Sequence, residues 1–418
     1  MRFLNNSKNN IMYLNITIWF FGFISGFLLL LTGNTLNYWL AKDGCNLEII
    51  GFFSLVSLPY AINFLWAPLL DKTKLSFIKF DINNRLKWII VLHIAGALFL
   101  ACMGLCDPSE SQKTMALVAI ILSFINSSQD IALNSLRTEI IPQKKHGMTS
   151  GIYIFGYRCG MIVTGPIAIF SSQYISWQLT YIIFAFIYLL FPIILCSIKL
   201  VRKSHEDLQN YSAGETKIKA LFSNIGGIKT IIMLLLFLAL YRIADNFIGI
   251  MLNPFLIDQG FSDSQISLAG KLCGVIGSGI GGLIASYIMS KYSITQCLLW
   301  FGIGHAFSHA SYLSILYFKN NTEFLLLSTI SESITGGMTM AAYIGLLTSL
   351  CHGKFRATQY AVLSAMMGTS RTILPSFAGY IVVNTNWTIF FIVSILMIIP
   401  SIIILKKLEP QLIRRSYD

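Results

Sequence analysis

The stretch "MALVAIILSFINSSQDIALNSLRTEIIP", residues 115–142, runs from an apolar segment into a polar one that contains Asp130. Its apolar character lasts for about 20 residues, the length at which a helix crosses a hydrocarbon core of ~30 Å. A charged side chain near the centre of such a helix costs about 2.5 to 3.5 kcal/mol on insertion scales. A helix that retains this carboxylate therefore indicates a polar interior between packed membrane helices.

Apolar runs of similar length fill the rest of the chain. Of its 418 residues, 55% are hydrophobic and 11% are charged, whereas a soluble domain has about 25% charged residues. The runs do not alternate with a period of two, which excludes a transmembrane strand barrel. We therefore predict an all-α membrane protein with twelve transmembrane helices. The predicted spans are residues 12–40, 49–70, 87–106, 114–136, 149–171, 177–199, 229–256, 265–289, 295–317, 323–350, 359–383 and 388–405.

Basic residues are distributed unevenly among the connections. Of the 30 Lys and Arg residues, 23 lie at the termini and on one set of alternate connections, and 3 lie on the other set. Cytoplasmic loops of membrane proteins collect Lys and Arg. Both termini and the central loop are therefore predicted to be cytoplasmic. The net charge of +12 then follows from the membrane topology, so we predict no nucleic-acid partner.

A central segment of mixed charge, residues 199–228, separates two sets of six predicted spans, residues 1–198 and 229–418. Some residues recur in both sets, since Asp130 corresponds to Glu332 and Arg158 corresponds to Arg371. Two six-helix halves related by a repeat, with a site near the membrane midplane between them, are the plan of the major facilitator fold. The sequence therefore predicts a transporter of that fold.

Several charged residues fall inside the predicted spans. Because exposure to lipid is costly, each is expected to face the protein interior. They are either fixed ion pairs that join helices or contacts to a transported solute. The cations outnumber the acids by four to three, which favours an anionic solute. These residues are Asp130, Asp245, Glu332, Arg158, Arg242, Lys271 and Arg371.

Two spans place such residues on a defined face. Asn126, Asp130, Asn134 and Arg137 follow one another at steps of four, four and three residues, so they share one face of a helix that is expected to turn toward the interior. Arg242 and Asp245 are three residues apart and are expected to pair along one face.

Two further patterns resemble cofactor or metal motifs. The run "GKLCGVIGSGIGG", residues 270–282, contains GxGxxG, but no strand precedes it, so we interpret it as small residues for helix packing. His305 and His309 are four residues apart without an evident third ligand. We expect satisfied interior histidines, with pH sensing or solute contact as the alternative. No catalytic motif is present, so we predict neither enzyme activity nor a cofactor or metal site.

Segments along nearly every span resemble the AmpG-type muropeptide permeases of the major facilitator superfamily. The resemblance implies a bacterial inner-membrane transporter that imports anhydromuropeptides, GlcNAc-anhydro-MurNAc with or without peptide, from periplasm to cytoplasm for cell-wall recycling. It further implies that the proton gradient drives this import. The segments are "GFFSLVSLPYAINFLWAPLLDK" (51–72), "SSQDIALNSLRTEIIP" (127–142), "GYRCGM" (156–161), "LYRIADNF" (240–247), "GGMTMAAYIGLLTSLC" (336–351) and "ATQYAVLSA" (357–365).

The resemblance also assigns site residues. By motif position these are Gln129, Asp130, Arg158, Asp245 and Lys271. Members of the family commonly carry a second acid where this chain has Asn134, a departure that bears on proton stoichiometry and on substrate. We expect a monomer in the lipid bilayer. The alternatives are a facilitator of another anionic or amphipathic solute, a transport-inactive membrane receptor or scaffold, and a membrane-embedded enzyme.

Overall fold

The structure, a computed structural model, describes most of the chain, and all of the regular secondary structure in that part is helical. The described residues are 8–43, 56, 58–75, 82–108, 110–142, 145–172, 174–198, 201, 227–262, 265–266, 268–351, 355–372 and 378–414. They form two compact units. The first comprises Met1–Pro142, Gly156–Ser212 and Cys351–Ala361, and the second comprises Gln143–Phe155, Ala213–Leu350 and Val362–Asp418.

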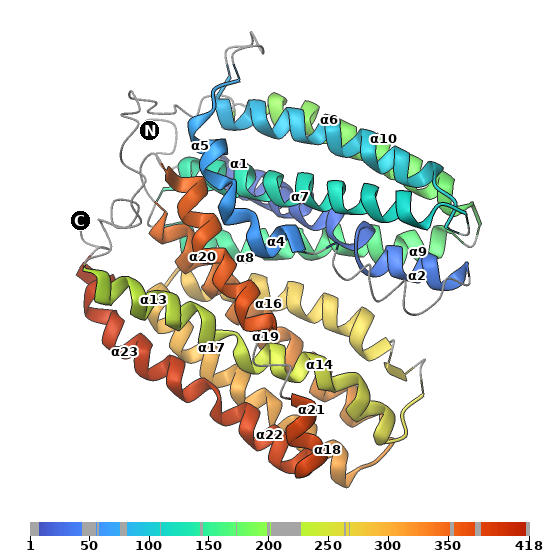
Figure 1. Cartoon of the computed structure of the whole chain (residues 1–418). Coiled ribbons are helices and arrows are strands. Elements are labelled where there is room, and N and C mark those ends of the chain that lie inside the picture. Colours follow the sequence, from blue (N-terminus) through green and yellow to red (C-terminus); the bar gives the residue numbers. More distant parts are fainter. Residues whose placement is uncertain are drawn as a thin grey trace. The chain divides into compact units, whose positions relative to one another are not determined.

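The first unit is built around α6, which packs against both α7 and α10, while α1 packs against α7 and η5 (Figure 1). Short helices near the start of the chain complete it. Its helices are α1 (Lys8–Leu31), α2 (Asn34–Lys42), α4 (Leu58–Ile62), η3 (Asn63–Leu65), α5 (Ala67–Lys72), α6 (Asn84–Leu105), α7 (Gln112–Ile140), η5 (Val163–Ile167), α9 (Ala168–Ser171) and α10 (Trp177–Ser197). Two further helices, α8 (His146–Ile162) and α20 (Arg356–Thr372), are divided between the units.

The second unit is built around α19, which packs against α16 and α17. An aromatic core that includes Phe247, Phe255, Tyr312 and Phe391 joins α14, α18 and α22. The helices are α13 (Ile228–Tyr241), α14 (Ile243–Asp258), η7 (Leu268–Cys273), α16 (Gly274–Met289), α17 (Ile294–His309), α18 (Ser311–Tyr317), α19 (Thr322–Leu350), α21 (Ala378–Asn384), α22 (Trp387–Leu396) and α23 (Ile398–Arg414).

Eight helical segments of the described residues are long and apolar enough to cross a membrane, and each coincides with a predicted span. They are Ile11–Leu40, Asn84–Leu105, Gln112–Ile140, His146–Ser171, Trp177–Ser197, Ile228–Asp258, Thr322–Leu350 and Trp387–Pro410. The other predicted spans fall on shorter helices or on residues that the structure does not describe. Span 265–289 is the π-helix η7 followed by α16, and span 295–317 divides at Ala310 into α17 and α18. Span 359–383 is α20 and α21 with residues 373–377 between them undescribed, and span 49–70 lies largely outside the described residues. The helical membrane fold is therefore confirmed, and the count of twelve remains a prediction.

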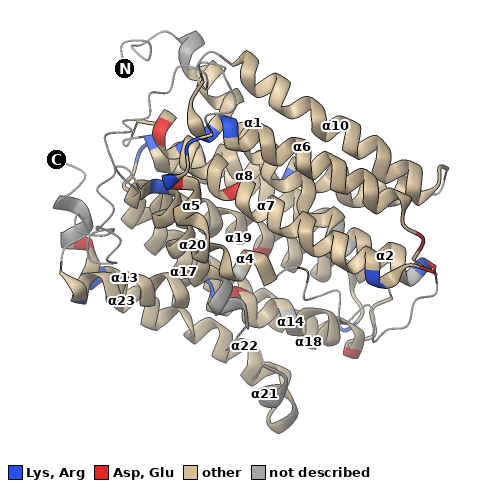
Figure 2. Ribbon diagram, turned by 45° about the horizontal axis from the view of Figure 1, so that its top comes forward, with Lys and Arg blue, Asp and Glu red and all other residues tan. Residues whose placement is uncertain are grey.

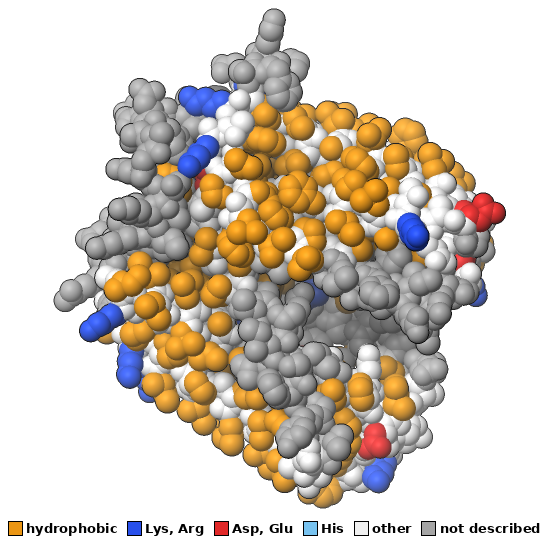
Figure 3. Space-filling view, viewed as in Figure 1, with side chains coloured by type: hydrophobic (Ala, Val, Ile, Leu, Met, Phe, Trp, Pro, Cys, Tyr) orange, Lys and Arg blue, Asp and Glu red, His pale blue; other side chains and the backbone are white. Residues whose placement is uncertain are grey.

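The surface of the first unit has the composition expected of a lipid-facing protein. Helix α10 contains no charged residue, α6 contains only Arg85 and Lys87 in its first turn, and Figure 2 shows both helices in tan along most of their length. Large apolar side chains on these helices are exposed, including Leu98 at 62% and Phe186 at 68%. Figure 3 shows hydrophobic side chains gathered over this region. A continuous exposed apolar surface of this kind is stable against lipid.

Glycines allow helix backbones to approach closely within each unit. In the first unit, a Cβ at Gly26 would collide with the backbone of Tyr157, and one at Gly156 with that of Trp19. In the second unit, a Cβ at Gly281 would collide with the backbone of Ile334. The interpretation of residues 270–282 as a packing face is confirmed for Gly281, which lies inside α16 against α19.

Candidate functional site

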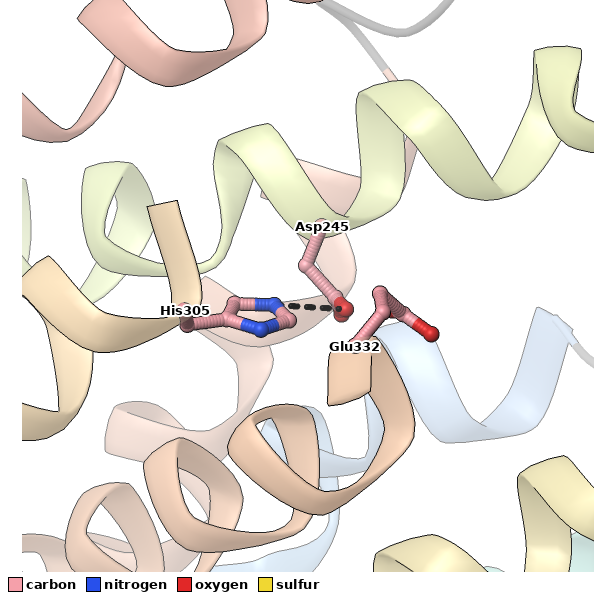
Figure 4. Close-up of side chains that lie close together, drawn as sticks. All are labelled: Asp245, His305 and Glu332. Carbon is pink, nitrogen blue, oxygen red and sulfur yellow. Dashed lines mark hydrogen bonds and ion pairs between the residues drawn. The ribbon is translucent and has the colours of Figure 1, made fainter. Parts of the chain in front are cut away.

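Charged side chains from three helices of the second unit converge at one place (Figure 4). Asp245 comes from α14, His305 from α17 and Glu332 from α19, and the side-chain nitrogen or oxygen that each offers lies within 4.8 Å of the others. Nε2 of His305 lies 3.2 Å from Oδ1 of Asp245, and Arg242 donates a hydrogen bond to Oδ2 of the same carboxylate. We call Arg242, Asp245, His305 and Glu332 the charged cluster. The side chains of Arg242, Asp245 and His305 are only 8% to 19% exposed.

Arg242 occupies a break in the helix that carries the cluster. Helix α13 ends at Tyr241, α14 begins at Ile243, and Arg242 between them has φ −100° and ψ 9°. Its Nη1 lies 3.3 Å from the carbonyl oxygen of Gly336 and 3.2 Å from Oγ1 of Thr339. The guanidinium therefore joins α14 to α19 while it pairs with Asp245. The predicted pairing of Arg242 with Asp245 along one face is confirmed.

Thr335 contacts the other side of the His305 ring. Nδ1 of His305 lies 2.9 Å from Oγ1 of Thr335. That hydroxyl also lies 2.9 Å from the carbonyl oxygen of Ser331 and 3.0 Å from Oγ of Ser308. The next residue is Gly336, where a Cβ would meet Cε1 of His305 at 3.3 Å, so the absence of a side chain leaves room for the imidazole. Both ring nitrogens of His305 are thus engaged.

The donor atoms of Asp245, His305 and Glu332 are close enough to raise the question of a metal ion. A metal would need a free lone pair on Nε2 of His305. This nitrogen instead hydrogen-bonds Oδ1 of Asp245, a contact in which it carries the proton. The metal ion would also lie near the positive guanidinium of Arg242, which donates to the second oxygen of the same carboxylate. The arrangement is that of a hydrogen-bonded ion cluster, and we do not assign metal ligands.

His309 differs from His305 although both lie on α17. Its side chain is completely buried, and neither ring nitrogen has a hydrogen-bond partner among the residues that the structure describes. Its ring centroid lies 4.7 Å from that of His305. The prediction of satisfied interior histidines is therefore wrong for His309, because the neighbouring ring offers no hydrogen bond in this edge-on arrangement.

The first unit contains a different kind of polar feature along α7. Asn126, Gln129 and Asn134 are buried, and Asp130 among them is partly buried. We call these four residues the α7 row. Asn126 donates to the hydroxyl of Tyr60, and Tyr188 donates to Oε1 of Gln129.

Much of the hydrogen-bonding capacity of the α7 row is unused. Nδ2 of Asn134 donates to the main-chain oxygen of Asp130 at 2.8 Å, within the helix. Four buried side-chain atoms of the row have no hydrogen-bond partner in the part of the chain that the structure describes. They are Oδ1 of Asn126, Nε2 of Gln129, Oδ1 of Asp130 and Oδ1 of Asn134. Buried polar groups are nearly always satisfied in folded proteins, so a row of exceptions indicates a place that receives polar groups from a ligand or from water.

The remaining predicted cations are placed separately. Arg158 lies on α8 in the first unit, with Nη1 3.5 Å from Sδ of Met161 and its guanidinium carbon 6.0 Å from the ring centre of Tyr157. Lys271 lies in η7 and Arg371 in α20. Their side chains are outside the described residues, so the prediction that they face the interior is not tested.

A second buried ionic site in the first unit lies at the end of α5. The carboxylate of Asp71 accepts hydrogen bonds from the main-chain N–H of Thr358 at 2.9 Å and from its hydroxyl at 2.7 Å, at the first turn of α20. Arg85 lies 3.6 Å from this carboxylate and 3.4 Å from that of Glu139. Burial raises the pKa of Asp71, against the opposing effects of Arg85 and of the hydrogen bonds from Thr358. A carboxylate at a helix N-terminus stabilises that helix end.

Three residues that contact the predicted site were not predicted with it. Tyr60 and Tyr188 bond the amides of the α7 row, and Thr335 bonds His305. Tyrosines 60 and 188 are far from α7 in the sequence, so no local pattern reveals them. Thr335 had a detectable signal, since it follows Glu332 by three residues and therefore lies on the same helix face.

Comparison with known proteins gives consistent results. Residues 18–316 and 234–416 match the model of the Major Facilitator Superfamily. The chain is 43% identical over 403 residues to a putative transporter, AmpG 1, of Rickettsia bellii (strain RML369-C), covering 94% of this chain and 98% of that protein. It is 30% identical over 386 residues to the anhydromuropeptide permease of Escherichia coli (strain K12), covering 92% of this chain and 77% of that protein.

Among solved structures, the major facilitator superfamily transporter FucP in its outward conformation is similar with a TM-score of 0.69. The alignment covers 95% of this chain and 98% of that one at 13% sequence identity. At such low identity the similarity concerns the fold alone.

Proposed function

This chain belongs to the AmpG transporters of the major facilitator superfamily, and from that premise we propose that it imports anhydromuropeptides from periplasm to cytoplasm. The import is driven by the proton gradient across the inner membrane, with both chain termini in the cytoplasm. The proposal draws its substrate from the anhydromuropeptide permease of Escherichia coli, which aligns with 92% of this chain.

The observation that carries the proposal is the set of four unpartnered polar atoms in the α7 row. An isolated scaffold helix gains nothing from such atoms, since each buried polar group without a partner costs about 1 to 3 kcal/mol. A solute that supplies hydrogen bonds recovers this cost when it binds.

The chemistry of the row suits a glycopeptide. Asn126 and Asn134 offer amide oxygens that accept hydrogen bonds, and Gln129 offers an amide nitrogen that donates one. Sugar hydroxyls and peptide amides both donate and accept, so they complement such a row. Arg158 is the cation that we assign to a carboxylate of the solute in this unit.

Asp130 is assigned as the proton-responsive carboxylate of the first unit. Its carboxylate interacts with the side-chain hydroxyl of Ser25 and with the charge of Arg137, and its Oδ1 has no hydrogen-bond partner among the described residues. A proton on that oxygen removes the charge without breaking a hydrogen bond. Such a group can alternate between charged and neutral forms during transport at little structural cost.

Vesicle uptake tests the function. Labelled anhydromuropeptide is expected to accumulate in right-side-out vesicles when the outside is acidic, and to equilibrate without accumulation when a protonophore removes the gradient. Everted vesicles under the same gradient report the direction of transport. Absence of uptake in every orientation, with the protein present in the membrane, would refute the proposal.

A matched pair of variants tests the role of the α7 row. Asn126→Ala removes the unpartnered oxygen together with the amide nitrogen that donates to Tyr60, whereas Ser127→Ala removes only a hydroxyl that bonds the Phe124 carbonyl at 3.0 Å. The first is expected to raise the half-saturating concentration about tenfold, corresponding to about 1.4 kcal/mol, and the second to leave it unchanged. Equal effects of the two variants would remove the row from the binding site.

Import of another anionic solute is the second candidate, and the hydrogen bonding of Asn134 favours it. Its amide nitrogen is used within α7, and its oxygen adds an acceptor without adding charge. Competition assays with unlabelled sugars, peptides and anhydromuropeptides distinguish the two candidates. Under the main proposal only the anhydromuropeptide competes at low concentration.

A further inference from the structure

The imidazole of His305 lies between two hydrogen-bond partners, one that only accepts and one that can donate or accept. On one side, Oδ1 of Asp245 only accepts hydrogen bonds when ionised, so Nε2 of His305 must carry a proton for the 3.2 Å contact to be a hydrogen bond. On the other side, the hydroxyl of Thr335 at 2.9 Å from Nδ1 can either donate or accept. The contact with Asp245 thus fixes the proton on Nε2 and leaves the protonation of Nδ1 open.

The hydroxyl of Thr335 fits both states of Nδ1. When the ring is neutral, Thr335 donates its proton to the lone pair of Nδ1. When the ring is an imidazolium, Nδ1–H donates to Thr335, whose own proton then turns to the Ser331 carbonyl at 2.9 Å or to Oγ of Ser308 at 3.0 Å. His305 therefore gains or loses a proton without losing either of its hydrogen bonds.

The net charge of the charged cluster depends on whether Nδ1 of His305 carries a proton. When Glu332 is ionised and His305 is an imidazolium, two cations face two carboxylates in the charged cluster. With a neutral ring, Arg242 alone faces Asp245 and Glu332, and one negative charge is in excess. An excess charge in a membrane interior is unfavourable, so the proton on Nδ1 is coupled to the charge of whatever else enters the cluster.

The titratable and charged groups around His305 come from its own helix and from the helices packed against it. His309 on its own helix lies edge-on to the ring, has no hydrogen-bond partner among the described residues, and interacts electrostatically with the Asp245 carboxylate. Helix α18 contributes Tyr312, whose hydroxyl is buried, and α19 contributes Glu332. Of the other helices packed against α17, α16 and α22 carry no charged residue, and the described charged side chains of α23, Lys406, Lys407 and Glu409, are exposed or half-buried.

We propose that His305 is the proton-binding group of the second unit, and that it takes up its exchangeable proton at Nδ1 while Thr335 reverses the direction of its hydrogen bond. The Nδ1 lone pair takes the proton from a hydronium ion in water on the acidic side of the membrane, and the same N–H bond breaks when the proton passes to water on the other side, so the step needs no other reactant. This role rests on the proposed proton-driven transport, and Thr335 is a positioning residue that acts through His305.

The test uses two substitutions of one residue. Thr335→Val keeps the shape of the side chain and removes the hydroxyl, whereas Thr335→Ser keeps the hydroxyl. The whole chain, reconstituted in lipid nanodiscs with ¹⁵N-labelled histidine, is titrated from about pH 5 to about pH 8. The spectrum contains 6 histidines, and His305→Gln identifies the signals of interest.

We expect the wild-type His305 signals to move between neutral and imidazolium positions across this range. In Thr335→Val the midpoint should fall by about one pH unit or more, because the charged ring loses a stronger hydrogen bond than the neutral ring does. Thr335→Ser should restore the wild-type midpoint. A His305 signal that does not titrate, or equal midpoints in the Val and Ser variants, would overturn the proposal. So would a signal that responds to micromolar Zn²⁺ and not to pH, since that would indicate a metal site.

A transport measurement separates this proposal from the function on which it rests. His305→Gln is expected to lose accumulation driven by the pH gradient while it keeps exchange of labelled anhydromuropeptide across the membrane. If the wild type transports no anhydromuropeptide, the proposed function fails and the histidine titration still decides the proton site. Wild-type accumulation by His305→Gln would overturn the proton site alone.

Discussion

The α7 row and the charged cluster are both buried polar features of apolar helical units, yet they differ in how completely their atoms are paired. Four atoms of the row have no hydrogen-bond partner. In the cluster, both oxygens of Asp245 and both ring nitrogens of His305 are engaged. The row is therefore suited to donate and accept hydrogen bonds with a group from outside the protein. The cluster is suited to respond to a change in its own charge.

This difference is not visible in the repeat that the sequence predicts between the two halves. Asp130 and Glu332 are predicted to occupy corresponding spans, but amides, tyrosines and Arg137 lie near the first, whereas Arg242 and His305 lie near the second. Positions that the predicted repeat pairs thus carry different chemistry, because their neighbours come from other helices.

Loss of Arg242 is expected to have the largest effect. Arg242→Ala removes the cation from Asp245 and leaves two buried carboxylates facing His305 alone. Breaking a buried pair in this way typically costs about 3 to 5 kcal/mol of the free energy of unfolding. Thermal unfolding in detergent, measured together with the yield of folded protein, checks the prediction.

The double variant Arg242→Ala with Asp245→Asn provides its control. Removing both charges of the pair should recover more than half of the lost stability but none of the transport. A single Arg242→Ala variant as stable as the wild type would show that the cluster is no more tightly paired than the α7 row, and the comparison would fail.

Substitution of a packing glycine in either unit is expected to lower thermal stability by an intermediate amount that is similar in the two units. Gly281→Ala in the second unit and Gly26→Ala in the first each place a Cβ against a neighbouring helix backbone. Overpacking of this kind costs about 1 to 3 kcal/mol. Similar losses measured by thermal unfolding would show that the units differ in their polar groups rather than in their packing, and a loss in only one unit would contradict this.

The helices and the local pairs could be predicted from the sequence, because both depend on neighbours along one chain segment. Eight spans follow from apolar runs of sufficient length, and the Arg242–Asp245 pair follows from a spacing of three residues. The contact between His305 and Asp245 could not be predicted, since 60 residues separate them and only the packing of α14, α17 and α19 brings them together. The interruption of the seventh predicted span at Arg242 was also missed, because it depends on contacts to α19.

Tyr188→Phe is expected to have a smaller effect, limited to the first unit. The substitution removes the hydroxyl that donates to Gln129 and leaves the stacking on His93, with ring centroids 4.6 Å apart, in place. Hydrogen bonds between membrane helices contribute about 0.6 to 1.7 kcal/mol, so thermal stability should fall by about 1 kcal/mol. Binding of the labelled solute should weaken as well, because the freed Gln129 amide can rotate. Unchanged binding would show that Gln129 does not contact the solute.

Asp130→Asn is expected to have the smallest effect on stability and to abolish the coupling of transport to the proton gradient. The carboxylate has one oxygen without a partner, so exchanging it for an amide removes a buried charge and breaks no hydrogen bond to that atom. The free energy of unfolding should therefore stay within about 1 kcal/mol of the wild type or rise slightly.

The same substitution removes the only state change available to that side chain, because an amide does not bind a proton in the physiological range. Accumulation of labelled anhydromuropeptide against its gradient should cease, while exchange across the membrane should remain partly intact, since the amide keeps the shape of the carboxyl group. Asp245→Asn is the matched comparison, and it should lose stability as well, because Arg242 and His305 both contact that carboxylate. If Asp130→Asn accumulated the solute at the wild-type level, Asp130 would be a structural group and the charged cluster alone would carry the proton.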